Sequence, residues 1–325
     1  MKPASVSVSA PLRLSLGGGG CDLPEFYRTH GADVLSVAIN RRITVAVHPC
    51  NAVASGTNAR IDLLAERLPW PTRTKVASPV PPGSGLGGSG ALTVALVAAE
   101  RVLGGASTAD LAPLSIGREA YRWEREILGQ PVGFQDHMAS AFGSLTRMSA
   151  NMNARMGTEI GDDIAVERQE GLAEAFADML GHSVRLFPTR QVRNAAGQLA
   201  TFARNLVADG GQTSLADTPE FVAAITSRDG AEFGRLMRRR WERKVNLNPA
   251  AQWPGITTMV ADALALGATG AKVVGAGGGG WLMVAGPGEA MPAVTSVLTR
   301  RHALTEDRFH IDSAGIKVER AHIHD

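Results

Sequence analysis

The sequence predicts an α+β protein with two domains. Strand patterns come mostly early in the chain and helical patterns follow in runs, so the two do not alternate as they do in a βαβ protein. A domain usually holds about 150 residues, and 325 residues therefore favour two domains. The 37 glycines gather in three clusters, which indicates three particular loops rather than a low-complexity chain.

Composition excludes several classes of function. Apolar residues make up 44% of the chain and charged residues 20%, which is ordinary for a globular protein. A net charge of +2 gives no strong attraction to nucleic acid. Two cysteines cannot form a disulfide framework, and the longest apolar run, 91–99, is far short of the roughly 20 residues that span a bilayer. We expect a cytoplasmic protein with no nucleic-acid or membrane partner.

Local patterns give the expected elements. Alternating apolar residues predict a first strand at 6–16, and a β-rich stretch predicts two short strands within 34–47, separated near Asn40. Residues 50–80 are weakly patterned and are expected to form a connector with one or two helical turns near 61–68. Further helices are expected at 88–103, 110–128, 134–142, 167–180, 190–206, 218–226, 230–244, 255–266 and 287–301, and further strands at 143–152, 183–187, 272–274, 281–285 and 309–318. The polar stretch 157–168 is the expected domain boundary, dividing residues 1–165 from residues 166–325.

The second glycine cluster is the most informative stretch of the chain. It reads Pro-Pro-Gly-Ser-Gly-Leu-Gly-Gly-Ser over residues 81–89 and runs directly into an apolar helix. Glycines allow the backbone to approach a ligand closely, and a helix N-terminus offers unpaired N–H groups and partial positive charge. The stretch therefore predicts a phosphate-binding loop. The alternative is a tight turn before a buried helix.

Two better-known phosphate motifs do not fit. Gly83, Gly85 and Gly88 match the dinucleotide fingerprint in spacing, but prolines precede them where that fingerprint needs a buried strand. A second match in the third cluster, residues 275–280, leads into a strand-like run rather than a helix, and a glycine-rich hairpin turn is its alternative reading. A P-loop needs a lysine that residues 83–89 lack.

Acidic residues at three places could complete such a site. Mg²⁺ takes oxygen ligands, which Ser89 at the helix start and a glutamate from 110–128 (Glu119, Glu124 or Glu126) could supply. Asp136 follows a Pro-Val-Gly turn and could accept a proton from a substrate hydroxyl, although it could also be a simple first-turn helix acid. Asp22 ends the first glycine run, where it could point at a ligand or cap the next helix.

These motifs, in this order, resemble those of the GHMP kinases, the galactokinase–homoserine kinase–mevalonate kinase–phosphomevalonate kinase superfamily. The three matching segments are 10–22, 81–91 and 272–281. Within the superfamily, Ala-Pro-Leu-Arg at 10–13 and Leu-Gly-Gln-Pro-Val-Gly-Phe-Gln-Asp at 128–136 are most similar to the heptose 7-phosphate kinase branch. That branch usually has Thr at Cys21, Ser at Gly88 and a polar residue at Phe134, and its 49–78 segment, which helps to hold the adenine, is usually longer.

The resemblance implies a two-domain GHMP-kinase fold, with an N-terminal mixed α/β domain that carries the nucleotide loop and a C-terminal ferredoxin-like α+β domain. It implies ATP and Mg²⁺, with the triphosphate over the loop and the metal held by Ser89 and Glu124. Asp136 would be the base, and Arg13 would offset charge on the acceptor oxygen. The nucleotide-binding residues would be Pro82, Gly83, Ser84, Gly85, Leu86, Gly87, Gly88 and Ser89. The substrate-binding residues would be Arg13, Gly18, Gly19, Asp22, Asp136, Arg193, Lys244, Gly277 and Gly278.

The implied activity is phosphoryl transfer to a sugar hydroxyl, with the anomeric C1 hydroxyl of a heptose 7-phosphate as the first expectation. Lys244 lies in a basic run at 235–244 that could equally be a solvated helix face. Two alternatives stay open: an anomeric kinase of an unphosphorylated sugar such as galactose or fucose, and a nucleotide-binding sugar sensor without turnover. The partner is in each case a small sugar or sugar phosphate, and the protein is expected to be a monomer or a homodimer.

Overall fold

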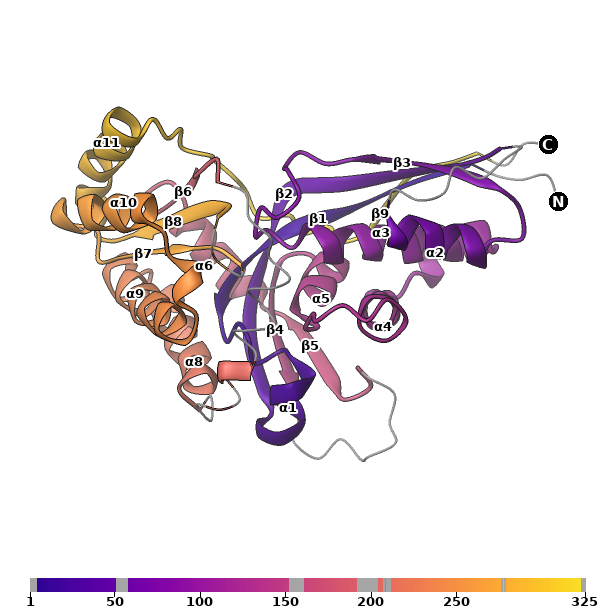
Figure 1. The fold of residues 1–325 in the computed structure, drawn as a ribbon, viewed down its shortest axis with the longest axis horizontal. Coiled ribbons are helices and arrows are strands. Elements are labelled where there is room, and N and C mark those ends of the chain that lie inside the picture. The colour runs from indigo at the N-terminus through magenta and orange to yellow at the C-terminus, as the bar shows by residue number, and fades with distance from the viewer. Residues whose placement is uncertain are drawn as a thin grey trace.

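Two antiparallel sheets organise the fold (Figure 1). The structure is a computed structural model and describes residues 5–50, 58–151, 161–191, 204–206, 208, 212–275, 277 and 279–322. The larger sheet is built mainly from the N-terminal half, and the smaller one lies wholly in the C-terminal half. Helices cover both sheets. The α+β, two-domain prediction is confirmed.

The large sheet has the order β5-β4-β2-β1-β9, and β3 pairs with the far end of β2. Its strands are β1 (Ser5–Gly17), β2 (Ala32–Pro49), β3 (Thr72–Ala77), β4 (Leu145–Ala150), β5 (Ile164–Arg168) and β9 (Lys317–His322). The two short strands expected within 34–47 are one long strand, β2. Its register against β1 shifts between Pro11 and Leu12, so that Asn40 and Arg41 bulge out of the ladder. Pro11 has no N–H to donate to the ladder, and the bulge lies next to it. The bulge coincides with the break expected near Asn40, but pairing continues on both sides of it and β2 remains one strand.

Helix α3 (Gly88–Leu103) is the centre of the layer on one face of this sheet (Figure 1). Its own side chains are small and apolar on nearly all sides, and the helix packs against β1, β2 and its neighbouring helices. Those neighbours are α2 (Ala59–Arg67), α4 (Pro113–Arg122), the π-helical turn Trp123–Ile127 and α5 (Gln135–Phe142). The short helix α1 (Pro24–His30) lies between β1 and β2 in the sequence.

The expected connector at 50–80 holds more structure than its sequence indicates. Residues 58–80 contain α2, which Asn58 caps by accepting a hydrogen bond from the Arg60 N–H, and the edge strand β3. In β3 only Thr72 is buried, so the strand carries no apolar alternation. Pairing with β2 rather than local pattern decides its conformation.

The C-terminal half surrounds a three-stranded sheet of order β6-β8-β7. Its elements are α6 (Glu170–Met179), β6 (Val184–Pro188), α8 (Gln212–Thr226), α9 (Gly230–Leu247), α10 (Pro254–Ala265), β7 (Gly270–Val273), β8 (Trp281–Ala285) and α11 (Met291–His302). Three of the four strands of a ferredoxin-like sheet are present among the described residues. After α11 the chain leaves this sheet and pairs with β1 as β9, so the last strand expected at 309–318 is shifted towards the C-terminus.

The division at residues 165 and 166 stays a prediction. Strand β5 crosses it, and β9 belongs to the N-terminal sheet. Helix α8 contacts β1, β2 and α9, so it joins the two halves. Within the described ranges, no helix combines the length and the apolar character that crossing a membrane needs.

Close packing of α9 on the small sheet gives a stability test. A Cβ at Gly234 would lie 2.1 Å from the Thr269 hydroxyl and 2.7 Å from the Ala285 carbonyl, whereas a Cβ at Gly171 in α6 would have no neighbour within 4 Å. We expect Gly234→Ala to lower the free energy of unfolding in urea by about 1–3 kcal/mol. Gly171→Ala, the matched control, should leave it unchanged or raise it by up to about 1 kcal/mol. Equal effects of the two substitutions would contradict the packing described here.

Candidate active site

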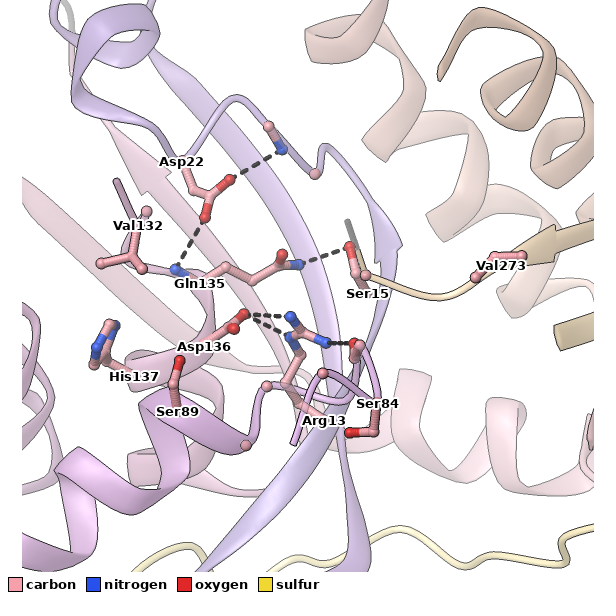
Figure 2. Close-up of a pocket in the computed structure, with 18 of the residues that line it drawn as sticks. Arg13, Ser15, Asp22, Ser84, Ser89, Val132, Gln135, Asp136, His137 and Val273 are labelled. Atoms are coloured by element: carbon pink, nitrogen blue, oxygen red, sulfur yellow. Dashed lines mark hydrogen bonds and ion pairs between the residues drawn. The ribbon is translucent and has the colours of Figure 1, made fainter. Parts of the chain in front are cut away.

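A cavity of about 530 Å³ lies where the two halves of the protein meet (Figure 2). Strand β1, the loop before α3 and the start of α5 line it from the N-terminal half, and α9 and β7 line it from the C-terminal half. The charged side chains along its walls are basic Arg13, Arg60, Arg240, Arg243, Lys244 and Lys272 and acidic Asp22, Asp136 and Asp217. Six basic side chains against three acidic ones favour an anionic ligand.

The nucleotide loop predicted from the sequence forms one wall. Gly85 and Gly87 have φ values of +78° and +76°, and a Cβ at Gly85 would lie 2.3 Å from the Val274 carbonyl, so glycine is needed there. Gly87 is the N-cap of α3, and no side chain caps this helix. Since Gly87, Gly88 and Ser89 all line the cavity, the positive end of a 16-residue helix faces it.

Gly90 brings a second helix start to the same place. A Cβ at Gly90 would lie 2.6 Å from the Cβ of Asp136 and 3.1 Å from the backbone nitrogen of His137. Without a side chain, α3 and α5 approach at their first turns, and the Asp136 carboxylate lies beside the loop (Figure 2). A glycine in the first turn of α3 therefore joins the phosphate cradle to the candidate base.

Arg13 fixes that carboxylate. Its Nε and Nη2 lie 2.7 and 2.5 Å from Asp136 Oδ1, and its Nη1 donates to the Gly85 carbonyl over 2.7 Å (Figure 2). The Arg13 side chain is 6% exposed and that of Asp136 27%, so the arginine is buried behind a carboxylate that reaches the cavity. The buried charge of Arg13 in β1 is thus paired, and its hydrogen bonds connect β1 to the loop and to α5.

Asp22 lies deeper in the same cavity. Its two carboxylate oxygens accept hydrogen bonds from the backbone N–H groups of Gly20 and Gln135. Burial, together with the negative charge of Asp136, raises the pKa of Asp22 above its usual value. Asp22 is not the N-cap of α1, which is Leu23, and one of its oxygens instead accepts from the first N–H of α5. It presents a buried carboxylate that can hold the hydroxyls of a bound ligand.

Glu124 lies behind the cavity wall. It is fully buried in the π-helical turn, and the Arg60 guanidinium and the Thr93 hydroxyl lie 2.6 and 2.5 Å from its Oε1. Burial alone would raise the pKa of Glu124, but His137 and Arg60 outweigh it and lower the pKa. Turns of π-helix are rare and often mark functional sites.

Basic residues of α9 and β7 line the opposite wall of the cavity. Arg240 donates to Asp217 over 2.7 Å and to the Gly19 carbonyl over 3.0 Å, and Lys272 donates to the carbonyls of Ser15 and Leu16. Lys244 donates to the Gly275 carbonyl. Burial, with Arg240 and Arg13 nearby, lowers the pKa of Lys244 from 10.5 to about 7. Burial also lowers the pKa of Lys272.

The structure brings most of the sequence candidates to one cavity. Its walls include Arg13, Gly19, Asp22, Pro82, Gly83, Ser84, Gly85, Gly87, Gly88, Ser89, Asp136 and Lys244. Gly18, Leu86, Glu124 and Gly277 do not line it, and their roles stay predictions. Leu86 is buried, and its carbonyl accepts a hydrogen bond from the Arg13 N–H. Arg193 and Gly278 lie outside the described residues.

Several cavity residues carried no clear signal in the sequence. Gln135, which donates to the Ser15 hydroxyl, and His137 flank Asp136 in a motif in which the sequence indicates a role only for the aspartate. Lys272 is a single lysine at the start of the third motif. Arg60 fell in the weakly patterned connector, and nothing in its local sequence could have assigned it.

The donor set suits a magnesium–nucleotide complex. The Ser89 hydroxyl and Glu124 offer oxygen ligands, and Glu124 Oε2 is buried without a hydrogen-bond partner. No cluster of three His, Cys, Asp or Glu side chains suited to a metal occurs in the described part of the chain. Mg²⁺ needs no such cage, because it usually takes one or two protein oxygens and completes its shell with phosphates and water.

Comparison with known proteins decides the family. Residues 57–144 match the family model of the GHMP kinases N terminal domain, and residues 221–300 match that of the GHMP kinases C terminal. This chain belongs to the GHMP kinases. As a GHMP kinase it is a phosphotransferase with an alcohol group as acceptor, which confirms the expected family and reaction type.

Individual relatives of this GHMP kinase have different acceptors in their names. A mevalonate kinase of Methanothermobacter thermautotrophicus is 27% identical over 90% of this chain and 93% of its own length. A D-glycero-alpha-D-manno-heptose 7-phosphate kinase of Campylobacter jejuni is 26% identical over 47% of this chain and 52% of its own. The crystal structure of a D-glycero-D-manno-heptose 1-phosphate kinase from Bacteroides thetaiotaomicron has a TM-score of 0.71 at 21% identity, over 98% of this chain and 100% of that one.

Proposed function

We propose that this GHMP kinase transfers the γ-phosphoryl group of ATP to a sugar hydroxyl, and that the acceptor is the anomeric C1 hydroxyl of a heptose 7-phosphate. The observation that carries the proposal is the Asp136 carboxylate, held by Arg13 beside the uncapped N-terminus of α3. An anion site and a fixed base within one cavity are what phosphoryl transfer to an alcohol requires.

The nucleotide end of the cavity lies along the loop. The first-turn N–H groups of α3 would bind the triphosphate, and Ile43, Val80 and Leu92 offer an apolar wall beside it for the adenine. Ser89 and Glu124 would hold Mg²⁺. Bound there, the metal would neutralise charge on the transferred phosphoryl group.

The acceptor hydroxyl would meet Asp136. The carboxylate accepts the hydroxyl proton as the oxygen attacks phosphorus, and Arg13 offsets the charge that develops between them. Because Arg13 makes hydrogen bonds to both Asp136 and the Gly85 carbonyl, the base cannot swing away from the loop. Asp22 and Gln135 lie above it and would orient the other sugar hydroxyls (Figure 2).

The basic wall supports a phosphorylated acceptor. The triphosphate would lie at the loop, yet Arg240, Arg243, Lys244 and Lys272 line the cavity from the other half of the protein. An anion on the acceptor would meet these cations. Two of the relatives described above are named as kinases of heptose phosphates, which agrees with this charge distribution.

The choice of acceptor is tested with a coupled ATP-consumption assay on heptose 7-phosphate, galactose, fucose and mevalonate. We expect kcat/KM to be highest for heptose 7-phosphate. Lys244→Met should lower it by about 10–100-fold for this acceptor, the usual worth of a charge-assisted hydrogen bond, and leave the neutral sugars unaffected. Lys244 is protonated below its pKa of about 7, so the wild-type kcat/KM for the phosphorylated acceptor should fall as the pH rises through 7.

A higher kcat/KM for galactose or fucose would replace the heptose 7-phosphate proposal with the unphosphorylated-sugar alternative. ATP consumption with mevalonate alone would reject a sugar acceptor. Binding of nucleotide without turnover of any acceptor would favour the sensor.

The role of Asp136 is tested by Asp136→Asn. The amide oxygen still accepts a hydrogen bond from Arg13 but cannot take a proton, so we expect kcat to fall at least about 100-fold while nucleotide affinity is retained. Asp33→Asn is the matched control, because it breaks the Asp33–Arg147 ion pair outside the cavity and should keep full turnover. Near-normal kcat in Asp136→Asn would remove Asp136 from this role.

A further inference from the structure

Arg60 contacts both the cavity and the buried Glu124. Its side chain is 18% exposed, it lines the cavity, and its Nε lies 2.6 Å from Glu124 Oε1. His137 also lines the cavity, and its Nε2 lies 3.7 Å from Glu124 Oε2. Arg60 and His137 thus face the carboxylate from the cavity side, and Glu124 itself does not line the cavity.

Thr93 ties this carboxylate to the start of α3. The Thr93 hydroxyl lies 2.5 Å from Glu124 Oε1 and 3.0 Å from the Ser89 carbonyl, one helical turn earlier. Thr93 therefore connects Glu124 to the helical turn that carries Ser89, the other oxygen ligand in the proposed metal site. In this structure a cation is already present at Glu124, and that cation is the Arg60 guanidinium.

Arg60 and Thr93 both bond Oε1 of that carboxylate, so the oxygen left for a divalent ion is Oε2, next to the guanidinium. A divalent ion that reached Glu124 would be repelled by a guanidinium bonded to the same group, and burial weakens the screening by solvent. Arg60 has a long side chain in the first turn of α2, at the edge of the cavity. Guanidinium groups bind phosphate oxygens through two parallel hydrogen bonds, so nucleotide phosphate offers Arg60 a new partner.

We propose that Arg60 is an exchangeable counter-ion of the nucleotide site. Its guanidinium neutralises Glu124 in the metal-free protein, and it moves to the phosphate oxygens of the nucleotide when a divalent metal takes its place at the carboxylate. The inference rests on the proposed function, because it takes Glu124 as a metal ligand. Arg60 is a positioning residue for binding and makes no contact with the acceptor.

The test measures nucleotide binding without turnover. A non-hydrolysable ATP analogue is titrated into the full chain by calorimetry, first in EDTA and then over a series of Mg²⁺ concentrations, without acceptor. We expect Arg60→Gln to weaken analogue binding at saturating Mg²⁺ about tenfold, since the charge-assisted contact that Arg60 makes to phosphate in the metal-bound state is lost. In the same variant the Mg²⁺ concentration that gives half-maximal tightening should fall about tenfold, because Glu124 no longer has a competing cation.

Arg67→Gln is the matched control. Arg67 is on the same helix but pairs with Glu100 and Glu119 outside the cavity, so both quantities should stay at their wild-type values. If Arg60→Gln does not fold, Arg60→Lys replaces it. Arg60→Lys keeps the charge without the two-donor fork and should give values between those of wild type and those expected for Arg60→Gln. In the double variant Arg60→Gln, Glu124→Gln, the Mg²⁺ midpoint should equal that of Glu124→Gln alone.

Either of two results in Arg60→Gln overturns the inference: unchanged binding and an unchanged Mg²⁺ midpoint, or a raised midpoint. The raised midpoint would mean that Arg60 prepares Glu124 for the metal rather than competing with it. If Glu124→Gln alone leaves the Mg²⁺ dependence unchanged, the proposed metal site fails together with the inference. A shifted midpoint in Glu124→Gln with no effect of Arg60→Gln rejects only the counter-ion role.

Discussion

The close approach of α3 and α5 at Gly90 is the constraint on which the rest of the site depends. Any side chain at this position would meet the Cβ of Asp136 at 2.6 Å, so only glycine lets the two first turns meet. One of these turns carries the uncapped N–H groups and the other carries the carboxylate. Their separation is set by backbone packing within the layer under the large sheet, and not by a mobile side chain. Catalysis of phosphoryl transfer depends mainly on such positioning.

Arg13 adds the electrostatic counterpart of this constraint. A buried arginine within a strand costs desolvation energy, and its bonds to Asp136 and to the Gly85 carbonyl offset that cost. Through these bonds β1 holds the loop and the base in one geometry. The same half of the protein carries Glu124, which Thr93 connects to the first turn of α3, while the basic residues of α9 and β7 come from the other half. The cavity thus joins a nucleotide side to a side suited to an anionic acceptor.

Sequence predicted the parts of this arrangement that have local causes. The glycine–proline loop and the small apolar residues of α3 define a helix with the bounds 88–103 in both the sequence and the structure. Asp136 was placed at the start of a helix because a Pro-Val-Gly turn precedes it. Features that depend on tertiary contacts were not predicted. Strand β3 has no apolar alternation and exists because it pairs with β2, β9 returns from the far end of the chain, and Arg60 matters only because α2 lies against α3. The burial of Glu124 behind Arg60 was equally hidden, because spacing along the chain shows neither depth nor partners.

The most direct test of the account is a crystal structure of the protein with Mg²⁺ and a non-hydrolysable ATP analogue. The account expects the terminal phosphates at the first-turn N–H groups of α3, with the Ser89 hydroxyl on the metal and the Asp136 carboxylate facing the γ-phosphoryl group. A triphosphate bound away from residues 87–90, or an Asp136 carboxylate directed away from the γ-phosphoryl group, would contradict the central claim that two helix starts joined at Gly90 form the transfer site.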